Sequence, residues 1–101
     1  MERVAVLAIL EAKPGKENEV REFLAAALPL VESETETVAW YALQLGPSTF
    51  GIFDTFADQG GRDAHLLGAV AKALLETADK LFTTAPAIRQ ADILAVKPRR
   101  P

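Results

Sequence analysis

His65 is the only imidazole in the chain and therefore the first candidate for chemistry. With an ordinary pKa of about 6.5, a histidine can take up or release a proton near neutral pH. Two interpretations stay open: a general base at a pocket, or a half-exposed helix residue that is hydrogen-bonded to a neighbouring loop. If His65 is the base, the rate should rise with pH through about 6.5, and removing its ring should cost about 100-fold or more with the fold intact.

Trp40 and Tyr41 are adjacent aromatic residues, so on a strand their side chains face opposite sides of a sheet. An aromatic wall suits a planar phenolic or quinone-like molecule, and the polar group of a tryptophan or tyrosine can orient it. Packing in the core is the alternative interpretation. We expect a mainly apolar pocket between the helices and the sheet, lined by Trp40, Phe53 or Phe56, His65 and Leu66.

Asp54 is a carboxylate on the same strand face as the apolar residues Ile52 and Phe56. Burial at such a position makes a carboxyl group a candidate acid or base. The simpler interpretation is an ion pair with Arg62 or Arg89, or hydrogen bonds to the backbone of a hairpin. The sequence favours this structural role for Asp54.

Hydrophobic periodicity predicts seven elements that position these residues. Strands are expected at residues 4–12, 37–45, 49–57 and 88–96, and helices at 16–32, 62–67 and 69–82. Pro29 predicts a kink or break in the first helix, and Asp58 is well suited to cap the second. The order β-α-β-β-α-α-β favours an α+β, ferredoxin-like fold, with a four-stranded antiparallel sheet and its helices on one face.

The predicted strands are apolar on both faces, although helices on one side can cover only one of them. In the first strand, Val6 and Ala8 point one way, whereas Leu7 and Ile9 point the other. A sheet with one wet face would instead alternate apolar with polar residues. We therefore expect a homodimer that pairs the uncovered faces, the alternative being a monomer with a ligand pocket or an apolar surface.

Length, charge and composition exclude several classes of protein. The 101 residues suit one domain, expected at 3–97 with a short basic tail at 98–101. A net charge of −3 and the absence of a basic patch argue against nucleic-acid binding. The absence of cysteine excludes disulfide scaffolds and thiol catalysis, and no metal-ligand cluster or cofactor motif is present. The apolar run Val4–Leu10 is too short for a membrane span, so a cytoplasmic location is expected.

Three stretches carry a resemblance to a known family: TVAWYALQLGPSTFGIFDTFAD, GRDAHL and ADILAVK. With the order of elements, they resemble the antibiotic-biosynthesis monooxygenase domain over about residues 3–97. The resemblance implies a dimeric α+β barrel, in which two ferredoxin-like subunits pair their sheets. It also implies that Trp40 helps to form a pocket and that His65 lies at its mouth.

The resemblance implies a cofactor-independent monooxygenase that acts on a quinol or related phenolic, polyketide-like compound. The haem-degrading branch of the superfamily uses an asparagine on a strand of the pocket, whereas the only asparagine here is Asn18, at the start of the first helix. We therefore expect no cofactor and no metal. The alternative function is a non-catalytic dimer that binds a small aromatic ligand or serves as a stress-response accessory protein.

Overall fold

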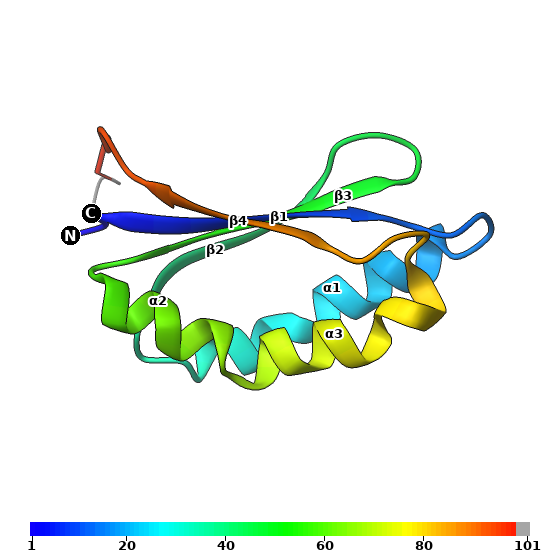
Figure 1. Cartoon of the computed structure of the whole chain (residues 1–101), viewed down its shortest axis with the longest axis horizontal. Coiled ribbons are helices and arrows are strands. Elements are labelled where there is room, and N and C mark those ends of the chain that lie inside the picture. Colours follow the sequence, from blue (N-terminus) through cyan, green and yellow to red (C-terminus); the bar gives the residue numbers. More distant parts are fainter. Residues whose placement is uncertain (99–101) are drawn as a thin grey trace.

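The structure, a computed structural model, describes residues 1–98 and contains one four-stranded antiparallel sheet (Figure 1). Its strands are β1 (Val4–Glu11), β2 (Thr37–Gln44), β3 (Thr49–Phe56) and β4 (Ala87–Asp92). The strand order is β2-β3-β1-β4, with each neighbouring pair antiparallel. This confirms the predicted ferredoxin-like α+β fold. Residues 99–101 of the predicted tail at 98–101 lie outside the described residues.

Three helices pack against the same face of the sheet and leave its other face uncovered (Figure 1). They are α1 (Glu17–Glu32), α2 (Gln59–Leu66) and α3 (Ala69–Leu81). Among residues 1–98, no helix combines the length and the apolar character that crossing a bilayer requires. Because the helices cover only one face of the sheet (Figure 1), an enclosed site can form on that side.

Helix α1 continues past Pro29 to Glu32 as one segment, so the break that was one of the two predicted outcomes does not occur. A proline removes only one backbone donor, and the face of the helix that meets the core holds it in place. Ala27 and Val31 on that face are both 6% exposed, one on each side of the proline. Packing on either side of Pro29 therefore outweighs the lost hydrogen bond.

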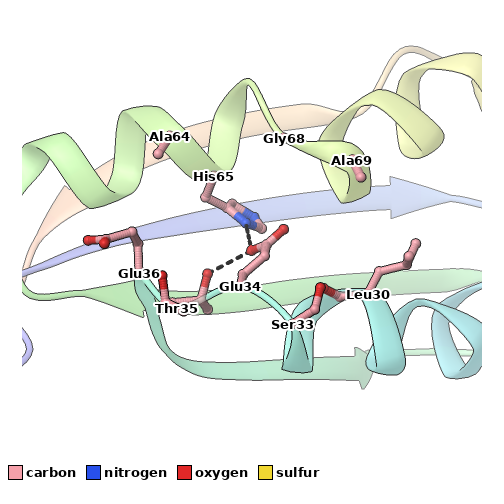
Figure 2. Close-up of a pocket in the computed structure, with 10 residues that line it drawn as sticks. Leu30, Ser33, Glu34, Thr35, Glu36, Ala64, His65, Gly68 and Ala69 are labelled. Carbon is pink, nitrogen blue, oxygen red and sulfur yellow. Dashed lines mark hydrogen bonds and ion pairs between the residues drawn. The ribbon is translucent and has the colours of Figure 1, made fainter.

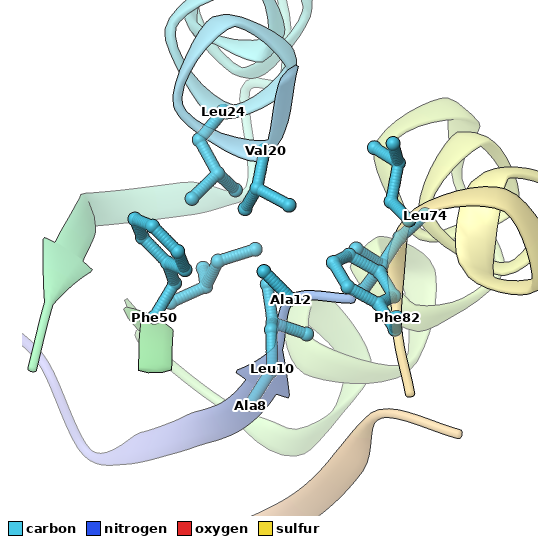
Figure 3. Packing of buried hydrophobic residues seen from close by; sticks show 10 residues of the cluster. Ala8, Leu10, Ala12, Val20, Leu24, Phe50, Leu74 and Phe82 are labelled. Carbon is cyan, nitrogen blue, oxygen red and sulfur yellow. The ribbon is translucent and has the colours of Figure 1, made fainter. Parts of the chain in front are cut away.

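The hydrophobic core lies between the helices and the sheet (Figure 3). Leu10 of β1 and Phe50 of β3 are cross-strand partners, and both are almost completely buried. Val20 and Leu24 of α1 pack onto them from the helix layer. This rigid centre lies toward one end of the sheet, and the polar residues described below lie toward the other.

Asp58 caps helix α2, as predicted: its side chain accepts a hydrogen bond of 2.8 Å from the backbone N–H of Gly61. The cap fixes where the helix starts and therefore which residues face the sheet. Gly61, Arg62 and His65 form the buried side of α2, at the three- and four-residue spacing of one helix face. His65 is thereby aimed at the sheet rather than at solvent.

The uncovered face of the sheet carries large apolar side chains, as the two-sided strands predicted. Tyr41 and Leu43 of β2 are 41% and 37% exposed, and the rings of Tyr41 and Phe53 stack with centroids 6.4 Å apart. Leu7 and Ile9 of β1 are also only partly buried on this side. A contiguous apolar surface of this kind is a typical interaction surface.

Candidate functional site

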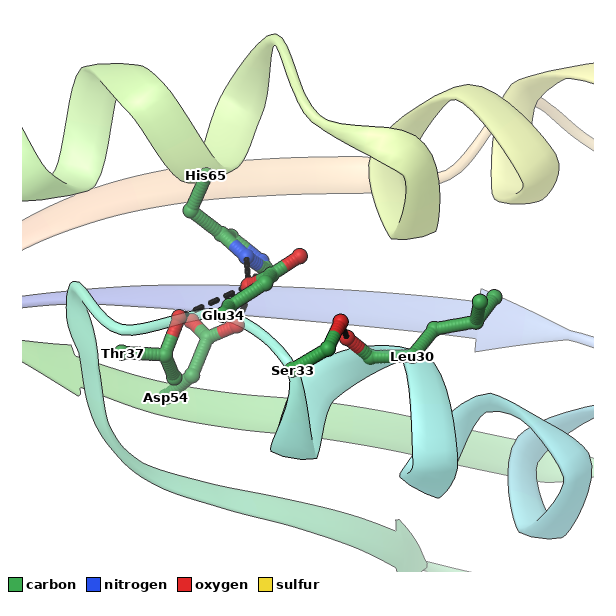
Figure 4. Close-up of polar contacts among 6 residues, drawn as sticks. All are labelled: Leu30, Ser33, Glu34, Thr37, Asp54 and His65. Atoms are coloured by element: carbon green, nitrogen blue, oxygen red, sulfur yellow. Dashed lines mark hydrogen bonds and ion pairs between the residues drawn. The ribbon is translucent and has the colours of Figure 1, made fainter.

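His65 lies between two carboxylates, one on each side of its ring (Figure 4). Its Nε2 lies 2.8 Å from Oδ2 of Asp54, and its Nδ1 lies 2.7 Å from Oε1 of Glu34. The side chains of His65 and Asp54 are 7% and 1% exposed, whereas Glu34 is 19% exposed. We call these three residues the carboxylate–imidazole cluster.

Each member of the cluster comes from a different part of the fold. Asp54 lies on the helix-facing side of β3, His65 on the sheet-facing side of α2, and Glu34 in the connection between α1 and β2. Thr37 at the start of β2 donates a hydrogen bond of 2.8 Å to the same Glu34 oxygen that faces His65. The ring of Phe56 lies against the imidazole, with centroids 5.2 Å apart. The position of the ring is therefore fixed from all sides.

The arrangement favours a protonated His65. A carboxylate oxygen is a hydrogen-bond acceptor, so a ring nitrogen that faces one is best placed as a donor. Here both nitrogens face carboxylates, and only the imidazolium has two N–H donors. Burial lowers the pKa of His65, but the hydrogen bonds and negative charges of Asp54 and Glu34 outweigh burial and raise the pKa above its usual value. The ionised cluster then carries one net negative charge.

Two expectations for His65 are corrected by this geometry. The residue is buried rather than half-exposed, and it is bound to a strand as well as to a loop. Both ring nitrogens are engaged by carboxylates, so neither is free to accept a proton from a bound molecule. In the outer part of the cluster, the acceptor that remains is Oε2 of Glu34, because Oε1 already receives His65 and Thr37.

The raised pKa of His65 predicts that stability falls as the pH rises. The stabilisation from the charged ring is fully present below the unfolded pKa of about 6.5, and it is lost as the pH passes through the higher folded pKa. In this window the free energy of unfolding should decrease by up to about 1.4 kcal/mol per pH unit. Urea unfolding of the wild type from pH 6 to 9 measures the slope, and His65→Gln should remove it. An equal slope in both proteins would contradict the assignment.

A cavity of about 320 Å³ opens beside the cluster, between the end of α1 and the junction of α2 with α3 (Figure 2). We call it the outer cavity. It is lined by Leu30, Ser33, Glu34, Thr35, Glu36, Thr37, Ala64, His65, Gly68 and Ala69. Its volume lies at the lower end of the range for small-molecule sites. None of these lining residues is Phe, Tyr or Trp, and the wall combines small aliphatic side chains with hydroxyl and carboxylate groups and the imidazole of His65.

A second, much smaller space of about 30 Å³ lies on the other side of His65, inside the core. We call it the inner chamber. Asp54, Trp40, His65 and Leu66 line it together with apolar residues of the sheet and of α3, namely Val6, Ala8, Ile52, Val70, Ala71, Leu74 and Ile88. His65 therefore forms part of the wall of both spaces, with Glu34 in the outer cavity and Asp54 in the inner chamber.

The predicted pocket between the helices and the sheet corresponds to this chamber, and three of its predicted residues line it: Trp40, His65 and Leu66. Phe56 is completely buried beneath His65, so it supports the site without lining it. Phe53 does not line this chamber. It neighbours Asp54 on β3, so it points to the opposite, uncovered face and stacks on Tyr41.

Asp54 does not pair with an arginine, as the sequence favoured, but with His65. Arg62 turns toward β4 and donates a hydrogen bond of 3.2 Å to the carbonyl of Ala91. Arg89 pairs with Leu7 in the sheet register, and Asp54 with Val6, so the two side chains occupy opposite faces. The buried carboxylate is therefore part of the candidate site.

The fold recurs in other solved protein structures. The structure superposes on a candidate antibiotic biosynthesis monooxygenase from Nitrosomonas europaea with a TM-score of 0.80, at 14% identity, covering 92% of this chain and 91% of that one. A candidate antibiotic biosynthesis monooxygenase from Caulobacter crescentus gives a TM-score of 0.77 at 18% identity, covering 93% and 92% of the two chains. The fold is thus that of the antibiotic biosynthesis monooxygenases.

A nearer relative is a protein of unknown function from Nitrosomonas europaea, NE2512. It is 48% identical, with a TM-score of 0.95, over 100% of this chain and 98% of that one. The chain therefore belongs to the same protein family as NE2512. No protein-family model matches the sequence, and a search of curated proteins found no match.

Proposed function

We propose that the protein is a cofactor-independent monooxygenase that acts on a quinol or a related phenolic compound bound in the outer cavity. The observation that carries the proposal is the carboxylate–imidazole cluster, with a buried ring held at 2.7 and 2.8 Å between Glu34 and Asp54. The shared fold of the antibiotic biosynthesis monooxygenases supports the reaction class as an analogy.

In this proposal, Glu34 is the proton acceptor, because its Oε2 is not engaged by His65 or Thr37 and the residue lines the outer cavity. A quinol hydroxyl group would donate to this oxygen and pass its proton to it. The adjacent imidazolium compensates the negative charge that develops on the substrate. A deprotonated quinol is easily oxidised and can pass an electron to dioxygen.

The overall reaction is quinol plus dioxygen to hydroxyquinone plus water. One oxygen atom enters the ring and the other leaves as water, and the quinol supplies all four electrons. Simple autoxidation of the same compound instead gives quinone and hydrogen peroxide. Mass spectrometry after reaction under ¹⁸O₂ therefore separates protein-dependent oxygenation from the background reaction.

Replacing Glu34 with glutamine is expected to lower the rate of hydroxyquinone formation from a menadiol-type quinol by about 100-fold, the usual effect of losing a positioned base. Glu32→Gln is a matched control, because it removes the same charge from an exposed residue at the end of α1. Oxygen uptake should stay at the wild-type rate in this control. Equal rates for the wild type and Glu34→Gln, with both above the protein-free rate, would reject Glu34 as the base.

A second candidate function is binding of a small aromatic molecule without turnover. One observation favours it: both nitrogens of His65 are engaged by carboxylates, so the ring has no free nitrogen for proton transfer. In that case, a quinol should bind with a saturable change in the fluorescence of Trp40, but oxygen uptake should equal protein-free autoxidation.

We further propose that the chain acts as a homodimer in which the uncovered faces of two sheets pack together. The exposed apolar residues of β2 and the absence of a helix on that face support this arrangement. Closing the sheet face would also complete the dimeric α+β barrel that the family resemblance implies. The cytoplasmic location stays a prediction.

A further inference from the structure

Two buried polar atoms in the inner chamber have no hydrogen-bond partner among the described residues. They are Nε1 of Trp40 and Oδ1 of Asp54. The other oxygen of Asp54 is bound to His65, and the side chain is 99% buried. Buried polar groups in folded proteins are nearly always hydrogen-bonded, to protein or to ordered water. Two unpaired polar atoms on paired strand positions therefore point to a common hydrogen-bond partner.

The two atoms belong to neighbouring positions in the sheet. Trp40 of β2 and Asp54 of β3 are direct cross-strand partners, and both line the inner chamber from its sheet side. Their chemistry is complementary, because an indole N–H only donates and an ionised carboxylate oxygen only accepts. A ligand that satisfies both must accept one hydrogen bond and donate another. A hydroxyl oxygen does both.

The size of the chamber selects among hydroxyl compounds. A space of about 10–15 Å³ is enough for one water molecule, and the chamber measures about 30 Å³. The remainder of its lining is aliphatic, from residues such as Val6, Ile52 and Leu74, and offers no further polar partners. The chamber therefore has room for a water molecule and is far too small for a quinol ring.

We propose that the inner chamber binds one long-lived water molecule that accepts a hydrogen bond from Trp40 Nε1 and donates one to Asp54 Oδ1. His65 contributes to the wall of the chamber, so this water extends the hydrogen-bonded chain from Glu34 in the outer cavity, through His65 and Asp54, into the core. The inference stands on the geometry of the chamber alone and holds for a catalytic or a binding protein.

The single tryptophan makes the test direct, because only one indole N–H signal exists in the proton–nitrogen NMR spectrum. Selective excitation of that proton in the free wild-type protein should give cross-peaks to water of opposite sign in NOE and ROE experiments. Cross-peaks of opposite sign in the two experiments identify a bound water, whereas chemical exchange of the indole proton with water gives the same sign in both. Absence of any cross-peak at the water frequency would overturn the proposal, and so would equal signs.

A steric variant provides the matched control. Ala71 of α3 lines the chamber, so Ala71→Val should fill part of it and abolish the water cross-peak without changing a polar group. Ala26→Val makes the same chemical change on the exposed side of α1 and should leave the cross-peak unchanged. A cross-peak of wild-type intensity in a folded Ala71→Val protein would place the water elsewhere and overturn the assignment.

Discussion

Replacing His65 with alanine is expected to lower the free energy of unfolding by about 3–5 kcal/mol near neutral pH, the usual cost of breaking a buried ion pair. Asp54 is 1% exposed, and its Oδ2 would lose its only described partner. Glu34 would then face a second carboxylate with no positive charge between them. This replaces the sequence-based expectation that the fold tolerates loss of His65. Urea denaturation at pH 7 measures the effect.

A double variant separates the buried charge from the loss of packing. Asp54→Asn removes the carboxylate that His65 neutralises, so His65→Ala should cost much less in that background than in the wild type. Equal costs of His65→Ala in both backgrounds would show that the ion pair contributes no stability.

The second large effect concerns two adjacent residues of β3 that face opposite sides of the sheet. Ile52 is 6% exposed in the core, whereas Phe53 lies on the uncovered face. Ile52→Lys should cost at least about 4 kcal/mol, because it removes a core side chain and buries a charge, and the chain should largely unfold. Phe53→Lys should instead yield a folded, soluble monomer.

Sedimentation together with circular dichroism distinguishes these outcomes. The wild type should sediment as a dimer of the 10.9 kDa chain, and Phe53→Lys as a single chain with a native spectrum. A wild-type protein that remains monomeric at micromolar concentrations would contradict face-to-face pairing. A stable dimer of Phe53→Lys would show that the subunits meet at another surface.

The fold could be predicted from the sequence because its signals are local. Period-two apolar strands, a change to helical spacing after residue 16 and the cap at Asp58 each require only a few neighbouring residues. The helix through Pro29 could not be predicted in this way. Its continuity depends on tertiary packing of Ala27 and Val31, which local propensity does not include.

The candidate site was predicted only in part, because its members are far apart in the chain. His65 stands out as the only histidine, and Asp54 as a carboxylate on an apolar strand face. Glu34 was missed because it lies within the acidic connection of residues 32–36, where nothing distinguishes it from its neighbours. A signal was nevertheless present, because the connection leads directly into β2, the strand that pairs with β3 and its Asp54. Thr37 at the start of β2 holds the Glu34 carboxylate.

The position of Phe53 outside the inner chamber could not be predicted, for a different reason. The sequence places Phe53 and Phe56 on opposite faces of one strand, but it does not say which face the helices cover. Asp54 shows which face the helices cover only when its partner on α2, His65, is known. Pairing between Asp54 and His65 is therefore the long-range contact that orients the whole site.

The central claim is that His65 is an imidazolium held between Glu34 and Asp54, and the most direct test is an NMR titration of this single histidine. Nitrogen-15 shifts of the ring report whether each nitrogen carries a proton. Because both ring nitrogens face carboxylates, the structure predicts that both are protonated at pH 7 and that the pKa of the ring lies above its ordinary value of about 6.5. A neutral ring at pH 7, with a pKa at or below 6.5, would contradict the claim.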